Sequence, residues 1–182
     1  LGNPPYVRQE LLGEIKPWLE QHYSVYHGVL DLYGYFFELG HRLLTTNGRM
    51  AYISSSTFFK TGSGENIREY LSSKVSLEKI IDFGDVQLFE GVTTYHAILV
   101  IKKKKPSGTH KSKILAVKDK LPENLQWVFE QEKALMAHRQ LGNHSWQLED
   151  ERLYALRNKL TADFPILKNV YSSPYRGVLT GF

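Results

Sequence analysis

The chain has 182 residues and a formal net charge of +4, and 42% of its residues are hydrophobic while 23% are charged. These values are typical of a globular protein with one sizeable core, or of one domain followed by the start of another. The sequence contains no cysteine, which excludes disulfide and thiolate chemistry, and no apolar run approaches the roughly 20 residues of a membrane span.

The first six residues carry the most specific pattern. Leu1-Gly2 has the character of a buried strand's end, and it runs directly into Asn3-Pro4-Pro5-Tyr6. The two prolines fix the backbone and remove two amide donors, so we expect the carbonyl groups of this turn to point outward unpaired. Asn3 adds a side-chain carbonyl, and Tyr6 adds a flat aromatic face.

Such a cluster of acceptors suits an exocyclic amino group on a planar base. An adenine would donate one amino hydrogen to the Asn3 side chain and the other to the Pro4 carbonyl, which makes the nitrogen a better nucleophile. The alternative interpretation is a Pro-Pro turn in which Asn3 caps a helix.

Helical spacing predicts the next elements. It runs from Val7 to Tyr23, with an interruption at Pro17 where a second helix can begin, and again from Asp31 to Leu44, where Asp31 favours the helix N-terminus. A left-handed turn around Asn47 ends this helix. Met50 to Ser54 predicts a short buried strand, and the succession of helix and strand indicates an α/β sheet.

Two more strands and a helix are expected before residue 102. Gly62-Ser63-Gly64 precedes a helix from Glu65 to Ser73, but no strand leads tightly into it and no Lys-Ser/Thr follows. We therefore interpret it as a loop and not as a phosphate-binding site. Val75 to Phe83 predicts a second strand, and Thr93 to Ile101 a third strand that runs antiparallel to it because only a short loop separates the two.

The pattern weakens after this point. We interpret the charge run Lys102 to Lys105 as a solvated hairpin tip, with phosphate contact as the alternative. One further edge strand is expected at Lys113 to Val117, and a helix at Glu149 to Lys159. The sheet-like pattern stops between residues 105 and 150, so we place a domain boundary in that range.

Several classes of site lack their residues. The seven histidines have no paired spacing typical of zinc ligands, so no metal is expected, and Ser54 to Ser56 lack the glycine-flanked elbow of a serine hydrolase. We expect a cytoplasmic protein without a membrane partner. The mild positive charge is compatible with a polyanionic partner. A start without methionine and an end at Phe182 without a closing helix favour a piece of a larger protein.

Five motifs occur in an order that resembles a known family. They are Asn3-Pro4-Pro5-Tyr6, Asp31-Leu32-Tyr33 at a helix start, Gly48-Arg49-Met50-Ala51-Tyr52-Ile53, Ile80-Ile81-Asp82-Phe83-Gly84 and Phe89-Glu90-Gly91-Val92-Thr93-Thr94-Tyr95. This order is similar to that of the adenine-specific amino DNA methyltransferases of restriction-modification systems, particularly the large fused Type IIG-like enzymes. The resemblance covers residues 1–105 and continues weakly to residues 175–182, which are similar to the opening of that family's target recognition domain.

The resemblance implies an α/β fold, namely the C-terminal half of a Rossmann-like S-adenosylmethionine-dependent methyltransferase sheet with a terminal antiparallel strand, followed by a mixed or helical extension. It implies that residues 1–105 are the C-terminal part of the catalytic domain. Residues 106–182 are then a linker and the beginning of the target recognition domain. The donor-binding motif of such enzymes precedes Asn-Pro-Pro-Tyr, so we expect it before residue 1 and expect this segment alone to be inactive.

The implied reaction moves a methyl group from S-adenosylmethionine to the amino group of an adenine flipped out of double-stranded DNA, within a restriction-modification or related phage-defence system. Such enzymes often hold a nuclease domain in the same chain, and its presence here stays open. The resemblance implies these catalytic residues: Asn3, Pro4, Pro5 and Tyr6.

Other residues take supporting roles in this interpretation. Tyr6 and Phe89 are expected to stack on the flipped base, with Phe89 chosen over Tyr95; the alternative for Phe89 is a hydrophobic plug beneath a hairpin. Asp31 and Tyr33 are interpreted as supporting or helix-start residues. The candidate DNA contacts are Lys60, Arg68 and Arg176, and solvated helix charges are the alternative for the first two.

Three other functions stay open. A cytosine amino methyltransferase would use the same acceptors. A protein glutamine methyltransferase also carries Asn-Pro-Pro-Tyr, but a small enzyme of that kind would not need the helical insertion from Val7 to Gly28. The third alternative is a non-catalytic DNA-binding or scaffolding segment.

Overall fold

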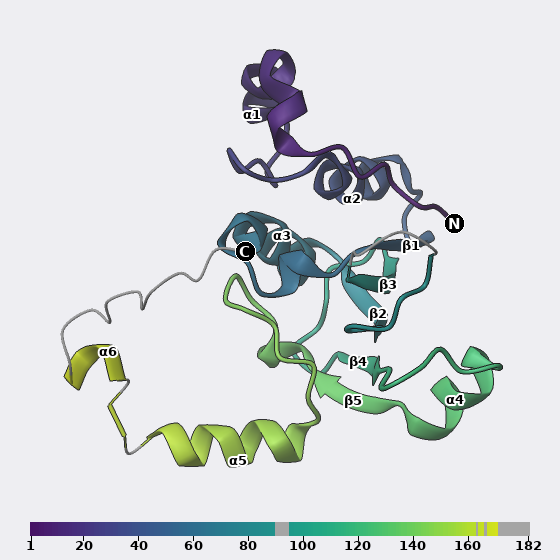
Figure 1. The fold of residues 1–182 in the computed structure, drawn as a ribbon, viewed down its shortest axis with the longest axis vertical. Helices are drawn as coiled ribbons and strands as arrows, with labels where there is room; N and C mark the ends of the chain where they lie inside the picture. The colour runs from purple at the N-terminus through teal and green to yellow at the C-terminus, as the bar shows by residue number, and fades with distance from the viewer. Residues whose placement is uncertain (90–94, 163, 166, 171–182) are drawn as a thin grey trace, which may run out of the picture. The chain divides into compact units, whose positions relative to one another are not determined.

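A five-stranded mixed sheet forms the centre of residues 1–150 (Figure 1), and its strands lie in the order β1-β3-β2-β4-β5. The computed structural model describes residues 1–89, 95–162, 164–165 and 167–170. The strands are β1 (Arg49–Ser55), β2 (Ser76–Asp82), β3 (His96–Lys102), β4 (Lys111–Ala116) and β5 (Ala134–Ala137). The helices of this unit are α1 (Lys16–His22), α2 (Leu32–Leu43), α3 (Glu65–Lys74) and α4 (Leu125–Glu132), and a 3₁₀ helix at Gln9–Ile15 precedes α1.

The third strand lies between the first two. Both β1 and β2 pair antiparallel with β3, so β1 and β2 run in the same direction and α3 connects them. The predicted antiparallel pairing of the second and third strands is therefore confirmed. Parallel strands joined by a helix, with an antiparallel strand inserted, also confirm the α/β class.

The N-terminus adds a parallel contact to the free side of β1. The Gly2 amide donates to the Ala51 carbonyl at 3.0 Å, and the Ile53 amide donates to the Gly2 carbonyl at 3.1 Å. A Cβ atom on Gly2 would lie 2.9 Å from the Tyr52 ring, so a glycine permits this close approach. The chain leaves the sheet at this point and enters Asn3-Pro4-Pro5-Tyr6.

Each face of the sheet carries its own hydrophobic core. Helices α2 and α3 lie side by side over one face (Figure 1), where Phe37, Ile67 and Leu71 pack with strand residues such as Ile80. On the other face, Phe129 of α4 packs with residues that include Ile81. Ile80 and Ile81 serve opposite cores because successive strand residues point to opposite faces.

The segment after β3 differs from the prediction. β4 pairs parallel with β2, and not with β3, so the chain at Lys102 to Lys105 crosses over and is not a hairpin tip. Lys103 is also not a purely solvated charge, because its ammonium donates to the Arg42 carbonyl at 2.9 Å and to the Leu44 carbonyl at 2.7 Å. It thereby binds the carboxyl end of α2.

β4 forms where a strand was expected, but it is not an edge strand. β5 pairs antiparallel with its other side, from Lys111↔Ala137 to Ile114↔Ala134. The first compact unit consequently extends to Asp150. The sheet thus continues beyond residue 105, while the assignment of residues 106–182 to a linker and a recognition domain stays a prediction.

The second unit comprises residues 151–182, and its described helices are α5 (Glu151–Ala162) and α6 (Leu167–Val170). The helix predicted at Glu149 to Lys159 is therefore confirmed within a few residues. Within the described residues, the structure contains no helix that is both long and apolar enough to cross a membrane.

Candidate active site

The predicted motif lies at the edge of the sheet where the parallel strands end. Gly2 pairs parallel with β1, so the chain that follows it runs toward the same edge of the sheet as the end of β1 at Ser55. β2 also ends at this edge, at Asp82, and the antiparallel β3 begins at it, at His96. In open α/β sheets, ligands bind outside the carboxyl ends of the strands. This edge is therefore the place to look for a site.

The motif is fixed on both sides. Before it, the Gly2 backbone bonds to β1. After it, the Leu32 amide donates to the Val7 carbonyl at 3.0 Å, and the Gln9 amide donates to the Asp31 carboxylate at 2.9 Å. Asp31 thus ties the segment after the motif to the start of α2, a role that differs from simple interaction with the helix dipole. A segment held at two ends presents its groups in a defined direction.

The residues of the motif differ in exposure. The Asn3 side chain is exposed, whereas Pro4 is buried and Tyr6 retains 38% of its accessible surface. Within the described part of the chain, neither the Asn3 side chain nor the Pro4 carbonyl has a hydrogen-bond partner. The exposed Asn3 side chain is consequently available to a donor outside the protein.

Aromatic rings from three distant segments meet beside the motif. The Tyr6 ring centroid lies 6.0 Å from that of Tyr33 on α2 and 6.0 Å from that of His96 on β3. The Phe89 ring lies 5.1 Å from the same His96 ring, at an interplanar angle of 70°. The two predicted stacking residues, Tyr6 and Phe89, therefore share one neighbour. Both keep exposed surface, 38% for Tyr6 and 42% for Phe89.

Burial raises the pKa of the phenols in this cluster. It raises the pKa of Tyr6 to about 12, with a further contribution from the nearby Tyr33 phenol. Burial also raises the pKa of Tyr33, whose hydroxyl lies 3.3 Å from the Thr57 hydroxyl. At neutral pH the Tyr6 ring is thus an uncharged stacking surface.

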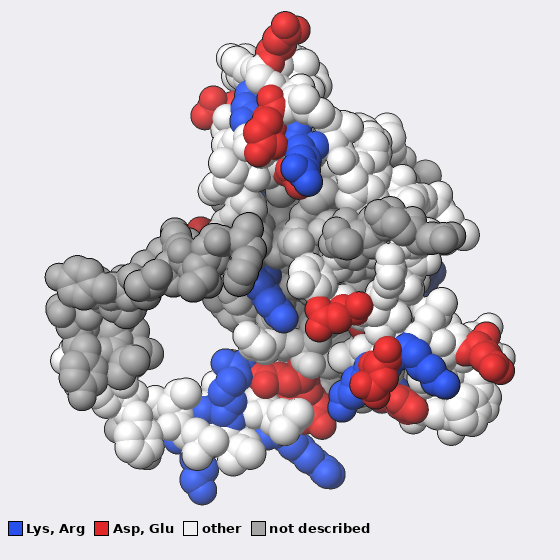
Figure 2. Space-filling view, in the orientation of Figure 1, with Lys and Arg blue, Asp and Glu red and all other residues white. Residues whose placement is uncertain are grey.

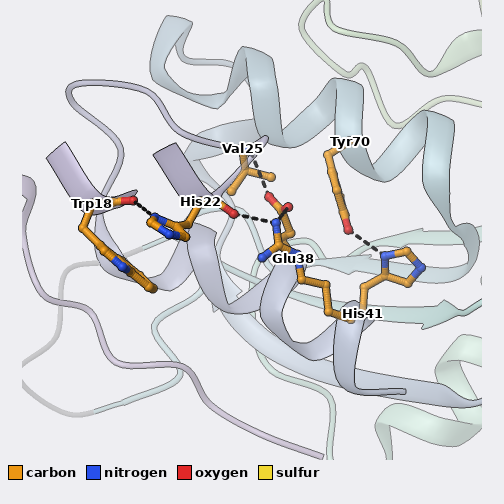
Figure 3. A network of polar contacts seen from close by, with 7 residues as sticks. Trp18, His22, Val25, Glu38, His41 and Tyr70 are labelled. Carbon is orange, nitrogen blue, oxygen red and sulfur yellow. Dashed lines mark hydrogen bonds and ion pairs between the residues drawn. The ribbon is translucent and has the colours of Figure 1, made fainter. Parts of the chain in front are cut away.

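The helical insertion that follows the motif is attached to α2 through a buried carboxylate. Figure 3 shows Glu38 of α2 pointing toward the segment at His22 and Val25. Glu38 is 1% exposed and accepts a hydrogen bond from the Val25 amide at 3.0 Å. It also pairs with Arg42, which donates to the His22 carbonyl at 2.6 Å. This network anchors the insertion to α2, the helix that also carries Tyr33.

A surface hollow of about 410 Å³ lies at the same sheet edge, between the ends of β1 and β2. Lys60 and Tyr95 line it, together with Asp82 and Asp85. Lys60 is exposed, so its ammonium is accessible at this edge. Tyr95 lines the hollow, whereas Phe89 contacts the ring that also touches Tyr6.

Arg68 does not suit the predicted contact with DNA phosphate. It is 3% exposed, and its guanidinium donates to the carbonyls of Phe58, Thr61 and Asn143, the last two at 2.7 and 2.8 Å. A guanidinium that binds three backbone carbonyls is a structural clamp. The prediction for Arg68 is therefore wrong, because the fold buries this face of α3.

Arg176, the third predicted DNA contact, lies outside the described residues. On the face drawn in Figure 2, Lys and Arg are interspersed with Asp and Glu around α4. The drawn surface around α4 is therefore of mixed charge. Among the described residues, there is no group of three or more His, Cys, Asp or Glu that could hold a metal ion.

His96 was not predicted as a site residue. It precedes a run of apolar residues in β3, and its sequence position alone gives no sign that its ring meets Tyr6. The signal is in the strand register: Ser55↔His96 pairing brings the start of β3 next to the end of β1.

Known proteins resemble this chain in sequence. Residues 1–89 match the family model described as Eco57I restriction-modification methylase. The Type II methyltransferase M.BstVI of Geobacillus stearothermophilus is 30% identical over 202 residues, which covers 100% of this chain and 35% of the relative. The Type II restriction enzyme and methyltransferase RM.Eco57I of Escherichia coli is 33% identical over 107 residues, which covers 57% of this chain and 11% of the relative.

A solved structure shares the fold. A nuclease-deletion mutant of the Type ISP restriction-modification enzyme LlaGI, in complex with a DNA substrate mimic, matches with a TM-score of 0.56 at 16% identity, covering 85% of this chain and 15% of that chain. The chain spans 35% and 11% of the length of the two curated relatives. Residues 1–89 thus match the Eco57I restriction-modification methylase family, and the chain is a homologue of Type II restriction-modification methyltransferases.

Proposed function

We propose that the protein containing this chain is a site-specific DNA methyltransferase that modifies the exocyclic amino group of an adenine extruded from double-stranded DNA, with S-adenosylmethionine as donor, in a restriction-modification system. The observation that carries this proposal is the arrangement at the sheet edge. There, Asn3 and Pro4 precede Tyr6 in one turn, and the partly exposed rings of Tyr6 and Phe89 share His96 as a neighbour. The similarity to Type II methyltransferases supports the same reaction class.

The geometry supports a division of roles. A target amino group inside a duplex is inaccessible, so the base must be extruded at a cost of a few kcal/mol. Stacking of a base on an aromatic side chain contributes roughly 1 to 3 kcal/mol, and this offsets part of that cost. Tyr6 and Phe89 provide the stacking surfaces in this proposal.

Asn3 and the Pro4 carbonyl then orient the amino group. Each accepts one amino hydrogen, which localises the nitrogen lone pair and directs it for attack. S-adenosylmethionine supplies an electrophilic methyl group when it is bound. The Asn3 amide, the Pro4 carbonyl and the Tyr6 phenol are all uncharged. Such groups suit a neutral amino group as nucleophile, because it needs to be positioned more than it needs to be deprotonated.

Identification of the methylated base tests the proposal. The full-length protein is incubated with labelled S-adenosylmethionine and unmethylated DNA, and the DNA is digested to nucleosides. We expect labelled methyladenine with the wild-type protein and none with Asn3→Ala, which removes one of the two acceptors. Asn124→Ala is a suitable control, because Asn124 caps α4 through its side chain and lies outside the proposed site.

The other outcomes are equally informative. Labelled methylcytosine would retain the role of Asn3 and overturn the adenine assignment. If the protein binds DNA but neither binds the donor nor transfers a methyl group, the proposed enzyme function is overturned in favour of a non-catalytic DNA-binding protein.

Lys60 is the remaining candidate for a DNA contact. Its exposed ammonium lines the hollow beside the proposed base site, where the backbone of the target strand would pass on its way to the extruded base. We propose a phosphate contact for this side chain, since lysine binds phosphate as a point charge.

A further inference from the structure

His96 is the group that the predicted stacking residues have in common. Its ring centroid lies 6.0 Å from that of Tyr6, with an interplanar angle of 68°, and 5.1 Å from that of Phe89, with an angle of 70°. Both arrangements are edge-to-face. The imidazole itself is 1% exposed, whereas Tyr6 and Phe89 are 38% and 42% exposed. A buried ring thus supports two exposed ones.

The backbone holds His96 firmly at this position. The Phe83 amide donates to the His96 carbonyl at 3.0 Å, and the Ser56 amide donates to the carbonyl of the preceding Tyr95 at 2.9 Å. These bonds connect the start of β3 to the ends of β2 and β1. The start of β3 is therefore held by backbone bonds on both sides.

We propose that His96 is a positioning residue that sets the distance and tilt between the Tyr6 and Phe89 rings, and thereby shapes the slot that receives the extruded base. This inference rests on the proposed function. His96 does not touch the base in it; the imidazole acts through the two rings that do. Its chemical requirement is a planar ring of similar size in a fixed place.

The energetics favour a ring at this position over an aliphatic side chain. Edge-to-face pairs contribute beyond their buried area, and the imidazole forms two of them at once. If the ring is removed, a cavity opens behind both stacking residues, and each gains freedom to turn away from the slot. The extruded base then stacks less well on the protein, so the equilibrium shifts toward the base that stays paired in the duplex.

The test compares three variants of the full-length protein. His96→Ala removes the ring, His96→Phe retains a ring of similar size, and Ile98→Ala truncates a partly buried residue on the same strand that packs in the core with Phe129 of α4. Each protein is assayed for methyl transfer to two duplexes. In one the target adenine is paired, and in the other it lies opposite an abasic site, which lowers the cost of extrusion.

We expect His96→Ala to lower kcat/KM for paired DNA by about 5-fold to 100-fold, the equivalent of two aromatic contacts. The abasic duplex should restore most of this loss, because extrusion no longer limits the reaction. His96→Phe should remain within about 3-fold of the wild type, since the edge-to-face contacts persist. Ile98→Ala should respond to the abasic duplex as the wild type does.

Other outcomes separate this inference from the proposed function. If the wild type transfers no methyl group, the proposed function fails. If the wild type is active and His96→Ala matches Ile98→Ala on both duplexes, the positioning role is overturned and the function stands. Loss of activity in His96→Phe equal to that in His96→Ala would also overturn it, because a ring alone would then not suffice. Thermal unfolding of each variant establishes that the compared proteins are folded.

Discussion

Lys60 and Arg68 occur in similar sequence surroundings but differ in their exposure to solvent. Each lies in or near a helix start in a stretch rich in hydroxyl and glycine residues. Lys60 is exposed at the hollow, whereas the Arg68 guanidinium donates hydrogen bonds to three backbone carbonyls. One is available to phosphate and the other stabilises the fold.

Substitution of these two residues should therefore change stability to different extents. We expect Arg68→Met to lower the free energy of unfolding by about 2 to 4 kcal/mol, because the carbonyls of Phe58, Thr61 and Asn143 lose their donor inside the protein. Lys60→Met should leave this free energy within about 0.5 kcal/mol. Urea denaturation of both variants measures the difference, and equal stability of the two would contradict the clamp.

Lys60→Met should instead weaken the binding of DNA. The loss of one phosphate contact reduces the slope of log K against log salt by roughly 0.9. Fluorescence anisotropy with labelled duplex over a salt series measures this slope. An unchanged slope would remove Lys60 from the interface.

At the scale of elements, the loop before α3 is set by steric fit. A Cβ atom on Gly64 would lie 2.2 Å from the Phe58 carbonyl oxygen, whereas one on Gly62 meets nothing within 4 Å. Gly64 has φ of −86°, which an alanine also adopts, so the constraint there is space and not backbone conformation. This is a structural reason for a glycine that needs no phosphate ligand.

Alanine at these two positions provides a matched comparison. Gly64→Ala should destabilise the protein by about 1 to 3 kcal/mol, since the backbone at Phe58 must move. Gly62→Ala should be neutral or stabilise it by up to about 1 kcal/mol. Thermal or urea unfolding of the two variants decides the matter, and a larger effect at Gly62 would contradict the packing described here.

The sequence predicts the long elements well because their patterns are local. The helix at α2 and the strands β1, β2 and β3 have clear apolar periodicity. β5 was missed because its four residues, Ala134 to Ala137, contain no β-branched side chain, and the strand forms by pairing with β4. The order of the strands after residue 102 also depends on which neighbour is free to pair, which no local pattern encodes.

At the scale of the candidate site, the same distinction holds. Asn3-Pro4-Pro5-Tyr6 could be found from the sequence because the motif is continuous. The shared contact of Tyr6 and Phe89 with His96 could not, because it joins residues that are far apart in the chain and meet only through strand register. Arg68 was misassigned for the same reason, as its carbonyl partners come from three separate segments.

At the scale of the whole molecule, buried phenols should make the protein sensitive to alkali. Burial raises the pKa of Tyr6, Tyr35 and Tyr70 to about 12 each, from an ordinary value of 10.0. Well below pH 10 these phenols are neutral in the folded and unfolded states alike. Between about pH 10 and about pH 12 the unfolded state loses protons first, so the stability of the folded state falls as the pH rises.

Urea denaturation at a series of pH values tests this. We expect a constant midpoint from about pH 8 to pH 9.5 and a steady decline above pH 10. Tyr35→Phe should make the decline shallower, because one of the phenols with a raised pKa is removed. A midpoint that does not change up to pH 12 would show that these phenols titrate normally.

The most direct test of the central claim is the single-turnover rate of methyl transfer by Asn3→Ala in the full-length protein, measured alongside its affinity for DNA. In the proposed function Asn3 orients the amino group and does not hold the duplex. We therefore predict a rate at least about 100-fold lower, with DNA affinity within about 3-fold of the wild type. A variant that binds DNA as the wild type does and transfers methyl groups at the wild-type rate would contradict the assignment of Asn3 and of the site built around it.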